Sequence, residues 1–100
     1  MSATNELAKK LDALGHPLRL RIVASLVDGK MYLNEIANTV GVSRALAKVH
    51  LKKLEKAGIV KSTIVVAEGE AKALRYYELL SFDLRVTPQI LRREVENSGQ

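Results

Sequence analysis

The sequence contains no cysteine and no tryptophan, and it has only two prolines and one phenylalanine. The lack of cysteine excludes disulfide bonds, thiolate metal sites and thiol-based redox sensing. No apolar run approaches the ~18 residues that a membrane-spanning helix needs. The start of the chain is charged and amphipathic rather than an apolar secretory signal. We therefore expect a soluble, cytoplasmic protein.

Catalytic motifs are also scarce. The chain has no glycine-rich phosphate-binding loop, and its serine, histidine and acidic residues form no suggestive set. We therefore expect no enzymatic activity and no cofactor. The length of 100 residues, of which 47% are hydrophobic, fits one domain over residues 1–95 followed by a disordered tail, 96–100. Because so small a core limits burial per residue, pairing of two chains is a common source of added stability.

Positive charge is concentrated in one segment. The formal net charge is +5, yet residues 1–42 and 63–100 each carry nearly balanced charges. Between them, Glu55 is opposed by the basic residues Arg44, Lys48, Lys52, Lys53, Lys56 and Lys61. Such a concentration of one sign on one element is typical of proteins that bind a polyanion, most simply the backbone of a nucleic acid.

Apolar spacing predicts four helices in the first part of the chain. Glycines or an Asp-Gly pair mark their ends, and Pro17 begins the second from its first turn. The expected helices are an opening one capped by Thr4 or Asn5 with Leu7, Leu11 and Leu14 on one face, a second from Pro17 to Asp28-Gly29, a third over Leu33 to Val40, and a fourth between the cap Ser43 and Ala57-Gly58.

The remaining sequence changes period and favours strands. The expected elements are strands over Ile59 to Ala67 and Leu74 to Leu79, a turn at Glu68-Gly69-Glu70, a short extended piece with Phe82, Leu84 and Val86, and a last helix from Thr87-Pro88 with Ile90, Leu91 and Val95 as its apolar stripe. This order predicts a mainly α fold with a β-hairpin (α+β), a winged helix–turn–helix. Residues 1–14 and 87–95 are the expected dimerisation helices.

The turn between the third and fourth helices carries the strongest signal. Gly41 stands where the chain needs a left-handed conformation, and Ser43 accepts bonds from free N–H groups of the next helix. At about 100° per residue, Ala47, His50, Leu51 and Leu54 share one face of that helix. The opposite face holds Arg44, Ala45, Lys48, Val49 and Lys52. A protruding helix N-terminus of this kind suits the major groove of DNA.

With these features the chain resembles the arsenic-repressor (ArsR) type of winged-helix transcriptional regulators. The matching stretches are ALGHPLRLRIV at 13–23, NEIANTVGVSRALAKVHLKKLEKAGIVK at 34–61 and RYYEL at 75–79. The resemblance implies that the fourth helix enters the major groove, that the hairpin is the wing, and that the first and last helices pair two protomers. Implied contacts to bases or phosphates fall on Ser43, Arg44, Ala45, Lys48 and Val49.

The chain departs from that family in three places. Met31-Tyr32-Leu33 stands where thiolate sensors carry a cysteine pair, so sensing of arsenic, cadmium or lead through cysteine is excluded. The last helix has no histidine to bind zinc. The acidic wing tip would repel the minor groove, and only Lys72 and Arg75 offset it.

Several assignments remain open on the sequence alone. Arg44 is expected to pair with guanine and Lys48 to contact a base or a phosphate, with an ordinary solvated cationic face as the alternative. Lys52, Lys53 and Lys56 face phosphates or only solvent. Leu7, Leu11, Ile90 and Leu91 form a dimer surface or complete a monomer core. We expect His50 and His16 to be structural, and one of Tyr76 and Tyr77 to be buried.

The function that follows is a dimeric, sequence-specific, double-stranded DNA-binding transcription regulator, with repression as its expected effect. Two other functions keep the same fold. One is an architectural protein that coats DNA without a preferred site, and the other is a winged helix that docks another protein.

Overall fold

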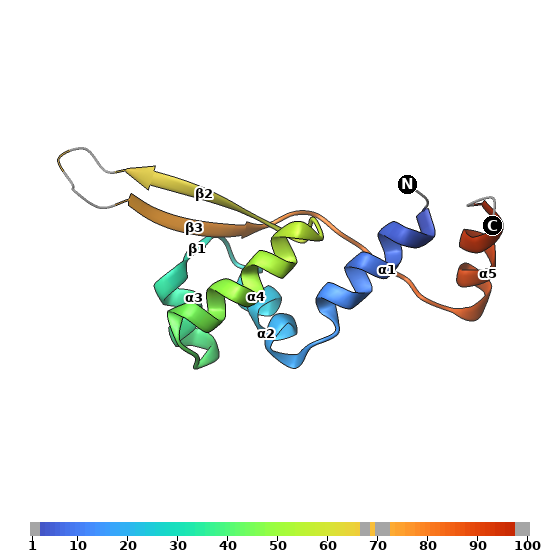
Figure 1. The fold of residues 1–100 in the computed structure, drawn as a ribbon, viewed down its shortest axis with the longest axis horizontal. Helices are drawn as coiled ribbons and strands as arrows, with labels where there is room; N and C mark the ends of the chain where they lie inside the picture. The colour runs from blue at the N-terminus through green and yellow to red at the C-terminus, as the bar shows by residue number, and fades with distance from the viewer. Residues whose placement is uncertain (1–2, 67–68, 70–72, 98–100) are drawn as a thin grey trace.

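The computed structural model describes residues 3–66, 69 and 73–97. Its elements in chain order are α1 (Ala3–Leu14), α2 (Pro17–Ser25), β1 (Met31–Tyr32), α3 (Leu33–Val40), α4 (Arg44–Lys56), β2 (Val60–Val66), β3 (Ala73–Leu79) and α5 (Pro88–Asn97). The molecule is elongated, with extents of 55 × 26 × 22 Å. The hairpin projects at one end, α1 and α5 occupy the other, and the remaining helices lie between them (Figure 1). This is the expected winged helix–turn–helix.

The helix boundaries differ from expectation at some ends. Helix α1 begins at Ala3, so the predicted caps Thr4 and Asn5 lie inside it. Helix α2 ends at Ser25, and the chain then turns before reaching Asp28-Gly29. The third and fourth helices have the predicted extents. The sequence did not reveal the early end of α2 because Leu26, in the turn that follows the helix, is buried. The apolar spacing therefore continues beyond the helix.

The core lies between the helices and the base of the sheet. Ile22, Ile36, Leu51, Leu54 and Ile59 have no exposed surface. They come from α2, α3, α4 and the start of the hairpin, so the inward faces predicted for these helices are confirmed. Helix α4 contributes its buried face to this core, which leaves its other face free at the surface.

The sheet contains a strand that the sequence did not predict. Its order is β1-β3-β2, with β3 pairing antiparallel to both neighbours. Met31 pairs with Tyr77 and Tyr32 with Tyr76. Two residues are too few for alternation to be visible, so β1 was missed. Tyr77 is buried and Tyr76 packs edge-on against Tyr32 on the other face, which confirms the expectation that one of the two tyrosines is buried.

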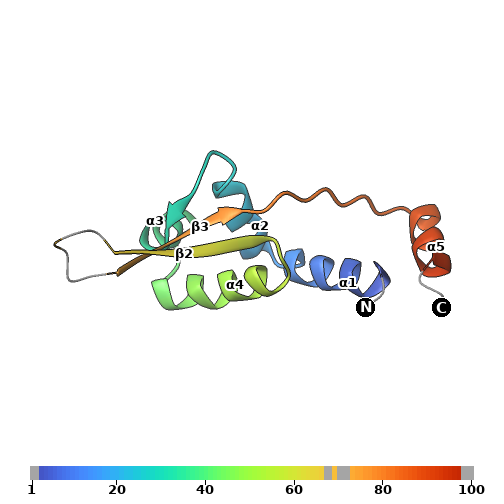
Figure 2. The same ribbon diagram turned by 90° about the horizontal axis from the view of Figure 1, so that it is seen from above.

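Beyond β1 the hairpin continues as two strands alone. Ile64, Val65, Val66 and Leu74 are exposed there, and the ribbon extends away from the helices (Figures 1 and 2). Gly69 has φ 81°, which fits its predicted place in the turn. The predicted acidic wing tip contains Glu68 and Glu70, and the cation predicted to offset it is Lys72. These three residues lie outside the described residues.

An extended stretch joins the sheet to α5. Phe82, Leu84 and Val86 lie in it, and these residues take no part in a strand. Thr87 Oγ1 accepts a hydrogen bond of 3.1 Å from the Ile90 N–H, as expected for the start of the last helix. Helix α5 runs to Asn97, so the predicted tail begins too early at residue 96. Helix α5 lies beside α1, where Thr4 Oγ1 donates to the Glu94 carbonyl at 3.4 Å.

Candidate nucleic-acid interface

The turn before α4 fixes where this helix begins. Gly41 has φ 76°, a left-handed conformation that side chains other than glycine adopt at a cost. The N–H groups of Gly41 and Val42 both donate to the Ala37 carbonyl, at 2.9 and 3.0 Å. Ser43 Oγ then accepts from the Leu46 N–H at 3.1 Å, which confirms the predicted cap. These bonds leave the first turn of α4 at the surface.

The outer face of α4 presents the predicted contact residues together. The side chains of Ser43, Arg44, Ala45, Lys48, Val49 and Lys52 are all exposed or partly exposed to solvent. Arg44, Lys48, Lys52 and Lys56 recur every fourth residue, so they form one cationic stripe along the helix. Val49, at 64% exposure, adds an apolar patch beside it. A helix with this face can offer both base-edge and phosphate contacts.

The base of the wing approaches the start of α4. Tyr32, Arg44, Lys48 and Arg75 line a hollow of about 150 Å³ between β1, β3 and α4. Three cations at the rim of one hollow favour an anion. The wing therefore adds to the positive surface of α4 at its base rather than through any described residue of its tip.

Arg75, expected to contact DNA, is held by other side chains. It is half-buried, and its Nη1 donates to Ser62 Oγ at 2.9 Å. Ser62 Oγ in turn donates to Glu55 Oε2 at 2.9 Å. This chain of bonds links β3, β2 and α4, and it sets the position of the wing relative to the outer face of α4. This role was not predicted from the sequence, although Glu55, the single acid among the basic residues of its segment, was a signal.

Lys53 points toward α1 rather than along the stripe. Its Nζ lies 2.9 Å from Asp12 Oδ2, and this hydrogen bond, together with the charge of Lys53, lowers the pKa of Asp12. Both side chains remain well exposed. The pair joins α4 to α1, so Lys53 is separated in direction from the other lysines with which the sequence grouped it.

A buried arginine supports α4 from behind, and sequence reasoning did not find it. Arg19 is 9% exposed. Its Nε donates to the Ala13 carbonyl at 2.5 Å and its Nη1 lies 2.9 Å from His50 Nδ1. His16 caps α2 by accepting from the Leu18 N–H at 3.0 Å, and its ring centroid lies 4.7 Å from that of His50. The structural roles expected for both histidines are confirmed.

The pKa of His50 is lowered, first by burial and then by the charges of His16 and Arg19. A neutral His50 is what the bond from Arg19 requires, since Nδ1 must accept. In the part of the chain that the structure describes, no group of three or more histidine, cysteine, aspartate or glutamate side chains could hold a metal ion. Over the same residues, no helix is long and apolar enough to cross a membrane.

Comparison with known proteins agrees with this geometry. Residues 16–62 match the model of the bacterial regulatory protein, arsR family. An HTH-type transcriptional regulator of Methanocaldococcus jannaschii is 30% identical over 92 residues, which cover 92% of this chain and 95% of that protein. The chain belongs to the arsR family. A biofilm growth-associated repressor of Xylella fastidiosa is 34% identical over 58 residues, and this arsR-family chain spans 51% of its length.

Solved structures show the same fold for this arsR-family member. The crystal structure of the transcriptional repressor BigR from Xylella fastidiosa aligns with a TM-score of 0.62 at 30% identity, over 77% of this chain and 72% of that one. The solution structure of a homodimeric winged helix–turn–helix DNA-binding domain from Mycobacterium bovis aligns with a TM-score of 0.64 at 25% identity, over 75% and 64%.

Proposed function

We propose that this protein is a dimeric, sequence-specific, double-stranded DNA-binding transcription regulator that represses by occluding a promoter. One observation carries the proposal: the capped first turn of α4 stands free at the surface with Arg44 and Lys48 on its outer face. Arg44 has the fork that pairs with guanine, and Lys48 reaches a base or a phosphate. Ala45 and Val49 suit the methyl group of thymine.

The other proposed contacts surround this turn. Ser43 and Lys52 face the phosphates on either side of it, and Arg75, with its Ser62 partner, borders the same hollow as Lys48. Lys53 and Lys72 were expected here as well. Lys53 reaches DNA only by leaving Asp12, which makes it a weaker candidate than Lys52.

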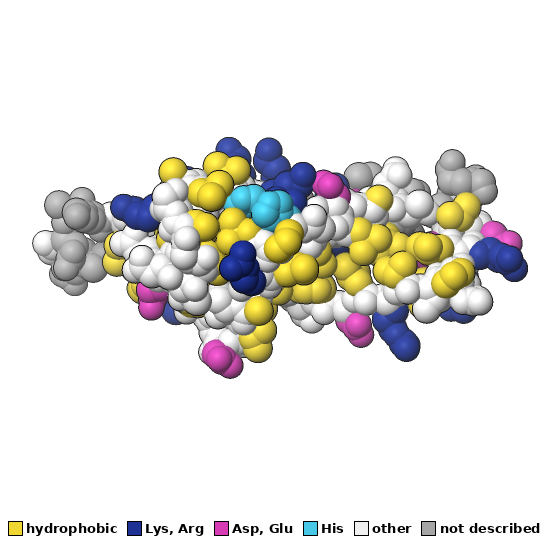
Figure 3. Space-filling view, turned by 90° about the horizontal axis from the view of Figure 1, so that it is seen from below, with side chains coloured by type: hydrophobic (Ala, Val, Ile, Leu, Met, Phe, Trp, Pro, Cys, Tyr) yellow, Lys and Arg dark blue, Asp and Glu magenta, His cyan; other side chains and the backbone are white. Residues whose placement is uncertain are grey.

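A two-fold dimer follows from the surface of α1 and α5. Leu11, Leu91 and Val95 are 39%, 40% and 42% exposed, while Leu7 and Ile90 are half-buried where the two helices meet. The face of the molecule seen from below carries a continuous apolar band toward the α5 end (Figure 3). A second copy would cover this band, and the Mycobacterium bovis domain of the same fold is homodimeric. Two α4 helices would then reach grooves one duplex turn, roughly 34 Å, apart.

Selection of bound fragments from genomic DNA, followed by titration, tests this function. An enriched inverted repeat is the expected result. On that repeat and on random duplex, Arg44→Ala should cost about 1–3 kcal/mol on the repeat alone, whereas Lys52→Ala should weaken both duplexes similarly. Equal losses for both variants on both duplexes would contradict the division between base and phosphate contacts.

An architectural DNA-coating protein is the second candidate, because the exposed face of α4 includes Ala45 and Val49, which cannot form hydrogen bonds to bases. A salt titration separates the two functions. A coating protein, which makes no base-specific contacts, should bind the selected repeat and random duplex alike at every salt concentration. A sequence-specific regulator should keep its preference for the repeat as non-specific binding falls steeply with salt.

A further inference from the structure

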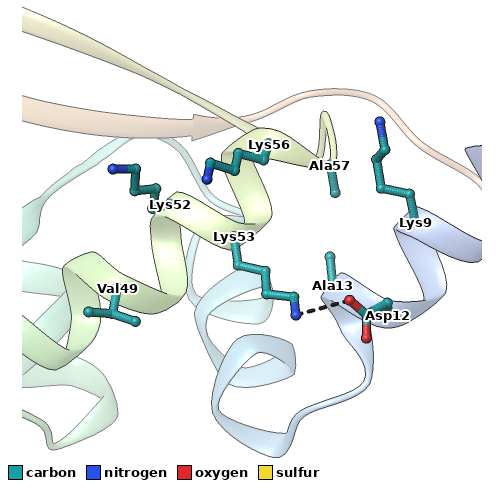
Figure 4. Close-up of a pocket in the computed structure, with 8 residues that line it drawn as sticks. All are labelled: Lys9, Asp12, Ala13, Val49, Lys52, Lys53, Lys56 and Ala57. Atoms are coloured by element: carbon teal, nitrogen blue, oxygen red, sulfur yellow. Dashed lines mark ion pairs between the residues drawn. The ribbon is translucent and has the colours of Figure 1, made fainter.

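A groove separates α1 from the second half of α4. It has a volume of about 580 Å³ and is lined by Lys9, Asp12, Ala13, Val49, Lys52, Lys53, Lys56 and Ala57. The small side chains of Ala13 and Ala57 face each other where the two helices meet, and lysines rise from both helices around them (Figure 4). Small-molecule sites commonly have this volume and combine apolar walls with a few polar groups.

The charge of the groove is positive and largely uncompensated. Asp12, its one acid, is bound to Lys53 at 2.9 Å. Lys9 lies 3.9 Å from Glu6, at the limit of an ion pair. Among the described residues, no carboxylate lies within 4.0 Å of the ammonium groups of Lys52 or Lys56. The groove therefore holds three lysines that can pair with an incoming anion, and Val49 gives it an exposed apolar side chain above the buried Ala13 and Ala57.

We propose that this groove binds a small amphiphilic anion, a molecule with an apolar body and one carboxylate, sulfonate or phosphate group. The apolar body would cover Val49 and the aliphatic stems of the lysines, above the buried Ala13 and Ala57. The ammonium groups of Lys9, Lys52 and Lys56 point in different directions in Figure 4 and would turn toward the anionic group. The phosphodiester backbone of DNA fits the groove less well, because it has no apolar group of its own to place against Val49.

Binding there would oppose the binding of DNA. Lys52 and Lys56 belong to the cationic stripe of α4, and an anion between them neutralises charge that a duplex would otherwise use. It would also press against α1 at the Lys53–Asp12 pair. The binding site itself does not depend on the proposed function; only its regulatory effect rests on that function.

The test uses 8-anilinonaphthalene-1-sulfonate, whose fluorescence rises in apolar surroundings, and the sulfonate-free N-phenyl-1-naphthylamine. The variant is Lys9→Ala/Lys56→Ala. Arg21→Ala/Lys61→Ala removes the same charge elsewhere and serves as the matched control. We expect one lysine-dependent sulfonate site per chain, about tenfold weaker in the groove variant, since one hydrogen bond to a charged group contributes at least 1.4 kcal/mol.

Three further results belong to the expected outcome. The control variant and N-phenyl-1-naphthylamine should show no such change, because dye on the apolar band of α1 and α5 does not depend on these lysines. Amide shifts on adding the sulfonate should centre on Ala13, Val49 and Ala57. Circular dichroism should show that both double variants are folded.

The proposal is overturned if sulfonate binding is absent, or if it is equal in the two double variants. It is also overturned if Lys9→Ala/Lys56→Ala weakens duplex binding and leaves sulfonate binding unchanged, which would assign the groove to DNA. Lysine-dependent sulfonate binding by a protein that binds no duplex would support the site and refute the proposed function. Release of the selected repeat by the sulfonate, lost in the groove variant, would support both.

Discussion

Replacement of Arg19 by alanine tests how α4 is held. The side chain is 9% exposed and forks between α1 and α4, with its Nε 2.5 Å from the Ala13 carbonyl and its Nη1 2.9 Å from His50 Nδ1. A third approach, to the Asp12 carbonyl at 3.5 Å, is too long to add much. Arg19→Ala therefore removes two charge-assisted hydrogen bonds and leaves both acceptors without this donor.

The expected loss follows from the burial of those acceptors. An orphaned buried acceptor costs about 1–3 kcal/mol, and the half-buried ring of His50 recovers part of this loss by binding water. We expect Arg19→Ala to lower the free energy of unfolding by about 2–4 kcal/mol, out of the 5–15 kcal/mol typical of a domain. With a urea slope near 2 kcal/mol/M, the midpoint falls by about 1–2 M.

Urea unfolding at one fixed protein concentration measures this change. Arg21→Ala, on the same helix but exposed, is the matched control and should move the midpoint by less than about 0.3 M. Arg19→Lys keeps the charge without the fork and should lose most of the same stability. If Arg19→Ala equals the control, or Arg19→Lys equals the wild type, the supporting role of the fork is refuted.

Three further changes have defined outcomes. The pKa of His50 is lowered from 6.5 in the folded state, so the unfolded chain binds more protons than the folded chain. The contribution of neutral His50 to the free energy of unfolding is therefore complete above pH 6.5 and is lost as the pH falls below it. His50→Gln should make the free energy of unfolding, measured from pH 8 to 5, less dependent on pH. Ser43→Ala removes the cap of α4 and should cost about 1 kcal/mol in thermal unfolding, with Ser43→Gly costing a few tenths. Ser62→Ala breaks the link between Arg75 and Glu55, so duplex affinity should fall while unfolding changes by less than about 1 kcal/mol, and Ser62→Thr should retain affinity in the same titration.

Much of the fold was predictable because its signals are local. The spacing of apolar residues, Gly41 and the cap at Ser43 each act within one or two turns of chain, and the structure confirms the helix–turn–helix that they predict. The early end of α2 and the two-residue strand β1 were not predictable in this way. Strand β1 exists because Tyr76 and Tyr77 offer a free edge, and these partners lie far along the chain.

The surface residues of the site were predictable from helical periodicity, but the residues that hold the site were not. The sequence around Arg19 looks like that of an ordinary exposed arginine. Arg19 becomes buried only when α1, α2 and α4 pack together. The direction of Lys53 depends on Asp12 in the same way. Side-chain pairs between distant elements leave no periodic signal, so the bracing of α4 became visible only in three dimensions.

The stripe of Arg44, Lys48, Lys52 and Lys56 has a geometric consequence. Four residues exceed one helical turn, so each step rotates the direction of the side chain by about 40°, and the whole stripe by roughly 120°. Arg44 therefore lines the hollow beside the wing, whereas Lys56 lines the groove between α4 and α1. The cations of this one helix therefore wind around it, so a duplex that contacts Arg44 at the first turn would approach Lys56 from a different side.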